Sequence, residues 1–86
     1  MKTWTARNVT MFPTQHKTLT PSDTVEFDQP IAIMVLNSGD VAIADKYNNV
    51  VTYTGVPAFT VIPVMARRLM STNTTASGFI GLFGFE

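Results

Sequence analysis

The hydrophobic positions of the chain follow β-strand patterns over most of its length, where short apolar segments alternate with polar connections. Residues 24–27 alternate between polar and apolar side chains. Residues 31–36 form an unbroken apolar run, which is short enough for a buried strand. Residues 41–45 and 50–54 contain the Val, Ile and Tyr side chains that favour strands. The pattern therefore predicts a series of short strands.

The connections between these segments contain residues that suit tight turns. The stretch TPSD at 20–23 combines a proline that fixes φ with Ser and Asp side chains that hydrogen-bond to nearby backbone. Gly39 lies in the connection 37–40 and can adopt a positive φ. The connection 46–49 contains two Asn residues, which tolerate the left-handed conformation. Turns of this kind predict antiparallel neighbours.

Residues 59–70 carry mixed signals, because helix-forming residues follow a β-rich stretch. Pro63 lies inside the segment and would break a helix. The segment is therefore predicted to be a strand, with a bulge or kink near Pro63.

The last nine residues, GFIGLFGFE at 78–86, are predicted to form a strand that is apolar on both faces. Phe and Gly occupy the odd positions from 79 to 85, while Ile80, Leu82 and Gly84 occupy the even ones. A half-exposed antiparallel strand would alternate with polar residues. We therefore expect both faces to be buried, one of them against a second subunit.

Residues 1–22 lack sustained periodicity and predict an extended N-terminal arm, with one short strand around residues 3–9. The remainder, 23–86, predicts a single β domain. The expected fold is all-β: a small antiparallel β-sandwich or barrel of about five to seven strands.

The composition indicates that this domain is an oligomer. Hydrophobic residues make up 45% of the 86 positions, mean hydropathy is +0.17, and only 14% of residues are charged. A domain of this size buries only about 60% of the surface that its unfolded chain exposes. The surplus apolar side chains are therefore expected to lie on a surface that a second copy covers.

Charge and residue chemistry disfavour several function classes. Six basic residues balance six acidic ones, which argues against phosphate-driven nucleic-acid binding. No apolar stretch approaches the roughly 20 residues of a membrane-spanning helix. The sequence has no Cys and a single His, His16, so no zinc site is expected. No catalytic or nucleotide-binding motif is present, and we predict neither enzyme activity nor a cofactor.

Two features of the sequence suggest contacts with another subunit. Arg67 and Arg68 interrupt an apolar segment, and in a strand they would point to opposite faces. Either one arginine is solvated and the stem of the other lies over apolar surface, or one of them forms an intersubunit ion pair. Trp4 and Phe12 are large aromatics in a polar arm, where they either pack on their own domain or contact a neighbour. The predicted interface residues are Trp4, Phe12, Arg67, Arg68, Phe79, Leu82, Phe83 and Phe85.

The order and spacing of several short motifs resemble a known family. The motifs are TPSD (20–23), SGDVAI (38–43), VVTY (50–53), GVPA (55–58), IPV (62–64), RRL (67–69) and TTA (74–76), followed by an apolar end. In this order they resemble the small head-spike base proteins of gene transfer agents and related tailed phages of proteobacteria. The resemblance covers roughly residues 20–83. The sequence departs from the pattern at Phe59, where glycine is usual, and at Met65 and Ala66.

The resemblance implies a virion structural protein on the capsid exterior. Such bases form ring oligomers and carry a spike or fibre, so the implied partners are further copies, the major capsid protein and a spike or fibre protein. The first hypothesis is therefore a spike base or head decoration subunit that docks on the capsid. A tail, baseplate or fibre component, or a capsid cement protein, is the alternative. A carbohydrate-binding β-sandwich is a third hypothesis, with Tyr47 and Tyr53 as its aromatic candidates.

Overall fold

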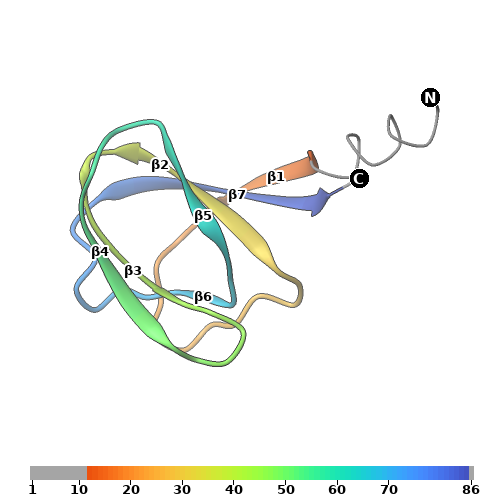
Figure 1. Ribbon diagram of the computed structural model, residues 1–86, viewed down its shortest axis with the longest axis horizontal. Coiled ribbons are helices and arrows are strands. Elements are labelled where there is room, and N and C mark those ends of the chain that lie inside the picture. The colour runs from red at the N-terminus through yellow and green to blue at the C-terminus, as the bar shows by residue number, and fades with distance from the viewer. Residues whose placement is uncertain (1–11, 86) are drawn as a thin grey trace.

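Two antiparallel sheets enclose the core in the computed structural model, which describes residues 12–85 (Figure 1). The four-stranded sheet has the order β1 (Pro13–Leu19), β7 (Ser77–Phe85), β2 (Ile31–Asn37) and β5 (Thr60–Ala66). The three-stranded sheet has the order β4 (Val50–Val56), β3 (Gly39–Ala44) and β6 (Arg68–Leu69). The predicted all-β fold with five to seven strands is confirmed, since residues 12–85 form seven strands in two sheets.

The core lies between the sheets and takes one face from each. Alternate residues of β2 and β7 point into it, because side chains on a strand alternate between the two faces. Full burial of such a side chain contributes roughly 1.5–3 kcal/mol. The largest fully buried side chains are Phe79, Ile31, Ile33, Ile62, Leu69, Val35 and Val41.

The segment 59–70 is extended, as predicted, and it changes sheets part-way along. β5 belongs to the larger sheet and β6 to the smaller one, with Arg67 between them. The Arg67 N–H donates to the Ala44 carbonyl at 2.7 Å, which brings the chain onto the edge of β3. The predicted irregularity near Pro63 is confirmed, because the register of β2 on β5 shifts between Ile31 and Ile33.

The strand predicted at residues 24–27 is absent. This segment makes a single backbone hydrogen bond toward β6, from Phe27 N–H to the Arg67 carbonyl at 2.8 Å. Phe27 packs against the core, whereas Val25 is 59% exposed. Two alternating apolar residues were too short a pattern to distinguish a strand from a covering loop.

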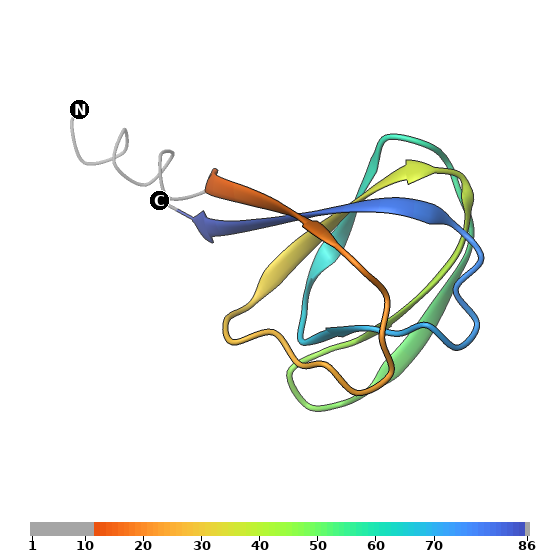
Figure 2. The ribbon, with the colours of Figure 1, turned by 180° about the vertical axis from the view of Figure 1, so that it is seen from behind.

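Residues 13–19, which the sequence analysis places in the arm, form strand β1. β1 pairs along β7 from Pro13 opposite Phe85 to Leu19 opposite Phe79 (Figure 2). Residues 14–18 are polar and exposed on both faces, and only Leu19 reaches the core, so the strand has no hydrophobic periodicity to detect. Backbone pairing with β7 holds it in place. The predicted strand at residues 3–9 and Trp4 lie outside the described residues, and the arm boundary at residue 22 stays a prediction.

The Asp23 carboxylate ties the turn at 20–23 to the loop that follows β6. It accepts hydrogen bonds from the backbone N–H groups of Ser71 and Thr72, each at 2.9 Å. It also accepts one from the Thr72 hydroxyl at 2.5 Å. These bonds, led by that of the Thr72 side chain, favour the charged form and lower the pKa of Asp23 below its usual value of 3.8.

We expect the Asp23 contacts to make the fold acid-sensitive. Because the folded-state pKa is lowered, the stabilisation is present above the unfolded value of 3.8 and is lost as pH falls below it. Asp23→Asn should lower the free energy of unfolding at neutral pH. It should also reduce the loss of unfolding free energy between pH 5 and about pH 2. Urea unfolding across this range measures both effects. Asp28→Asn is the control, since that carboxylate accepts no hydrogen bond among residues 12–85. Equal pH dependence in Asp23→Asn and wild type would contradict the role of Asp23.

Candidate interface

The strand register gives the four-stranded sheet a second apolar face, directed away from the core. Val35 opposite Phe79 faces the core, so Met34 opposite Ile80 and Ala32 opposite Leu82 face outwards. β5 continues this surface, since its residues alternate between buried and exposed. We call this surface the outer face; it consists of Ala32, Met34, Leu36, Val61, Pro63, Met65, Ile80 and Leu82.

The outer face is left open by the fold. The two sheets account for all seven strands of residues 12–85, so no third layer within these residues covers the outer face (Figures 1 and 2). Val61 is 46% exposed and Met65 is 38% exposed. Met34, Leu36, Ile80 and Leu82 are half-buried. A solvated sheet face normally carries polar side chains, so this one has the character of an interface.

Charge is segregated away from the outer face. Within residues 12–85 every Lys, Arg, Asp and Glu lies on another surface: Lys17, Asp23, Glu26, Asp28, Asp40, Asp45, Lys46, Arg67 and Arg68. Lys17 is on β1, but it pairs with Gly81 and therefore points to the opposite side of the sheet. Only His16, Thr14 and Thr18 border the face along β1. Depletion of charge in this way is typical of the centre of a protein interface.

The structure separates the predicted tail residues into two groups. Phe79 is 2% exposed and Phe83 is 9% exposed, and both belong to the core of their own subunit. Leu82 lies on the outer face. The strand is thus apolar on both sides because one side faces the core and the other forms part of the outer face. Whether these residues contact a second subunit stays a prediction.

Phe12 and Phe85 lie at the tip of a two-stranded ribbon. β2 pairs with β7 only as far as Leu82, whereas β1 continues to Phe85. The ends of β1 and β7 therefore project beyond the rest of the sheet (Figure 2). Phe12 is 67% exposed and Phe85 is 38% exposed. An isolated ribbon is marginally stable in water, so its aromatic tip is a second candidate contact.

Both predicted arginines have partners within their own subunit. Arg67 Nη2 lies 3.1 Å from Glu26 Oε1, and Arg67 Nη1 donates to the Lys46 carbonyl at 3.1 Å. Arg68 Nη1 donates to the Asp23 carbonyl at 2.7 Å. The ion pair is partly exposed and is worth about 0–1 kcal/mol at most. Additional intersubunit contacts of either arginine stay a prediction.

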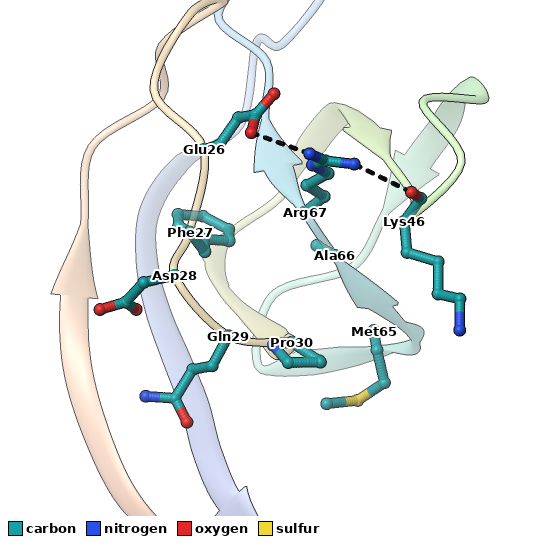
Figure 3. Close-up of a pocket in the computed structure, with 9 residues that line it drawn as sticks. All are labelled: Glu26, Phe27, Asp28, Gln29, Pro30, Lys46, Met65, Ala66 and Arg67. Carbon is teal, nitrogen blue, oxygen red and sulfur yellow. Dashed lines mark hydrogen bonds and ion pairs between the residues drawn. The ribbon is translucent and has the colours of Figure 1, made fainter.

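A pocket of about 480 Å³ lies where the loop before β2 meets the end of β5 (Figure 3). The Glu26–Arg67 ion pair lies at one side of this pocket. Met65 is shared with the outer face, so the two surfaces are continuous. The lining residues are Glu26, Phe27, Asp28, Gln29, Pro30, Lys46, Met65, Ala66 and Arg67.

Phe59 is a candidate that the sequence analysis noted only as a departure from a family pattern. It is 73% exposed and has a φ of 60°, in the left-handed region that bulky residues rarely adopt. Its N–H donates to the Val35 carbonyl at 2.6 Å, which places it at the start of β5. The sequence feature that could have identified Phe59 as a candidate is its place as a large aromatic directly after a Pro-containing connection.

The geometry gives little support to a carbohydrate site. Tyr47 is 74% exposed, but its ring has Lys46 Nζ 5.3 Å from the centroid. Tyr53 packs against the core. The two rings therefore do not form one exposed platform. Among residues 12–85, no group of His, Asp and Glu side chains is arranged to hold a metal ion. No helix of this part of the chain is long and apolar enough to cross a membrane.

Comparison with known proteins finds a relative among the solved structures. No family model matches the chain, and no curated protein matches it. A chain in the solved structure "Capsid of native GTA particle computed with C5 symmetry" shares 31% sequence identity with a TM-score of 0.70. The match covers 81% of this chain and 82% of that one.

The chain belongs to the capsid-related proteins of gene transfer agents and phages. This relationship confirms the broad class that the sequence motifs indicated. Assignment to head-spike bases in particular remains a prediction.

If the outer face is an interface, a charge placed on it should block association. We expect Val61→Glu and Leu82→Glu to raise the dissociation constant of the oligomer at least tenfold, or about 1.4 kcal/mol, since an unpaired carboxylate would be buried. Sedimentation velocity measures the change. Val50→Glu is a matched control, because Val50 is 49% exposed and Val61 is 46% exposed, but Val50 lies on the other sheet. Normal assembly of both outer-face variants would show that the outer face is not an oligomer interface.

Proposed function

We propose that this protein is a head subunit that docks on the outside of a capsid as a spike base or decoration protein. The observation that carries the proposal is the relationship to a chain of a gene transfer agent capsid particle, at 31% identity over most of both chains. The uncharged outer face supports it independently, since a subunit of an assembly needs such a surface. The role is structural, and the chain's contribution is to bind neighbours.

Assembly would proceed by burial of apolar surface. A stable interface buries about 800 Å² on each partner, and each well-buried Leu, Ile, Val or Met contributes roughly 1.5–3 kcal/mol. The outer face supplies seven partly exposed apolar side chains on one sheet: Met34, Leu36, Val61, Pro63, Met65, Ile80 and Leu82. Its eighth member, Ala32, is only 7% exposed and has little surface left to bury. A cyclic homo-oligomer is the arrangement we favour, because head-to-tail contacts form a closed ring when their rotation closes.

The ribbon of β1 and β7 supplies a second contact in this proposal. Its tip carries exposed Phe12 and Phe85 and extends beyond the sandwich (Figure 1). Lys17 Nζ lies 5.5 Å from the centroid of the Phe83 ring and covers its open side. In this proposal the tip contacts the major capsid protein or a spike or fibre protein, while the outer face binds further copies.

Labelling of intact particles tests this proposal against a tail, baseplate or fibre location. We expect an antibody against this protein to decorate heads without prior disruption of the particle, because the subunit lies on the exterior. Electron microscopy of labelled particles is the measurement, and particles lacking the protein are the control. Label confined to tails, or label that appears only after particles are opened, would contradict an external head position.

A further inference from the structure

We propose that Phe59 of one copy fills the pocket beside Met65 of the next copy. This inference deepens the proposed function and rests on it, because it assigns a contact within the homo-oligomer. Three observations carry it: the conformation of Phe59, its exposure, and the chemistry of the pocket.

The backbone conformation of Phe59 is unfavourable for a bulky residue. Three non-glycine residues among 12–85 have positive φ: Asn48, Phe59 and Asn73. Asn tolerates the left-handed region, because its short side chain hydrogen-bonds locally. A bulky aromatic at a φ of 60° is an outlier. Residues in strained backbone conformations of this kind cluster at functional sites, where the strained conformation is part of the function.

Packing within the subunit does not explain why a bulky aromatic occupies position 59. The Phe59 side chain is 73% exposed, so the subunit gains little from its apolar surface. Its position is nevertheless fixed, because the Phe59 N–H donates to the Val35 carbonyl and Thr60 pairs with the same residue. An exposed aromatic on a fixed backbone is a common interface anchor, because Phe has only two side-chain torsion angles to restrict on binding.

The pocket at the other end of β5 suits an uncharged aromatic ring. Phe27, Pro30, Met65 and Ala66 contribute apolar surface to it (Figure 3). Two acidic and two basic side chains also line it, so their charges sum to zero and select no charged ligand: Glu26, Asp28, Lys46 and Arg67. Its volume of about 480 Å³ lies within the range of protein ligand pockets and leaves room for a ring and part of its loop.

The positions of anchor and pocket require a second copy. Phe59 precedes β5, which runs from Thr60 to Ala66, and the pocket is lined by Met65 and Ala66 at its far end. At about 3.3 Å per residue the two features are roughly 20 Å apart. A chain therefore cannot fill its own pocket, and the contact is head-to-tail. Val61 and Pro63 lie between the two, so the same contact would cover part of the outer face.

Mixing two defective variants tests the proposal. Phe59→Asn removes the anchor but keeps a residue that tolerates the left-handed backbone, while Met65→Asp places a carboxylate in the pocket. We expect each variant alone to associate at least about tenfold more weakly than wild type. Mixed, they should form a one-to-one dimer and nothing larger, because only one sound anchor and one sound pocket remain per pair. Light scattering coupled to size-exclusion chromatography measures the masses.

Matched variants separate this contact from general effects of substitution. Phe59→Tyr keeps the ring and should assemble like wild type. Tyr47→Asn removes an aromatic that is 74% exposed, and Val51→Asp adds a carboxylate at a site that is 53% exposed; neither lines the pocket, and both should assemble normally. Phe59→Asn should melt no lower than wild-type protein that has been diluted to monomers, since backbone strain is removed.

The inference is overturned if the mixed variants remain monomeric, if Phe59→Asn assembles like wild type, or if wild-type protein is itself monomeric up to millimolar concentration. Failure of the proposed function has a different signature, because it is read from the location of antibody label on particles. If heads are labelled but Phe59→Asn assembles normally, the proposed Phe59 contact is wrong and the proposed function still stands.

Discussion

The two-residue period of strands β2 and β7 is the constraint on which the rest of the structure depends. A strand with apolar residues at every position needs apolar partners on both sides, and a two-layer domain supplies them on one side only. In this protein Ile33, Val35 and Phe79 use one side to form the core. Met34, Ile80 and Leu82 are thereby placed on the other side, where residues 12–85 provide no covering layer. The same pairing that builds the fold thus also builds its candidate interface.

The distribution of charge follows from this arrangement. Several charged side chains in the described part of the chain stabilise the connections between strands. Asp23 and Asp45 accept backbone hydrogen bonds in turns, and Arg67 pairs with Glu26. Contacts of this kind order the connections of a domain that is too small to rely on its core alone. They leave the four-stranded sheet free of charge on its outer side. A capsid-related subunit can therefore keep its loops fixed and still present a surface that loses little on desolvation.

Much of the fold could be predicted from the sequence, because β2, β3, β4 and β7 carry clear hydrophobic patterns. β1 could not, since residues 14–18 are polar on both faces, and the strand is held by backbone bonds to β7 and by Leu19 at its end. The candidate site was predicted only in part. The tail was recognised as apolar on both faces, but its pattern could not tell which face is the core, so Phe79 and Phe83 were grouped with Leu82. Phe59 was missed as a site because its backbone angle depends on tertiary pairing with Val35.

The central claim is that the outer face becomes covered on assembly, and the absence of cysteine from the sequence allows a direct measurement. Val61→Cys and Val50→Cys introduce single thiols at sites that are 46% and 49% exposed, on the outer face and on the smaller sheet. Their rates of maleimide labelling should be similar in dissociated subunits. In assembled particles we expect Val61→Cys to be protected while Val50→Cys still reacts. Equal labelling of the two thiols in the particle would contradict the account.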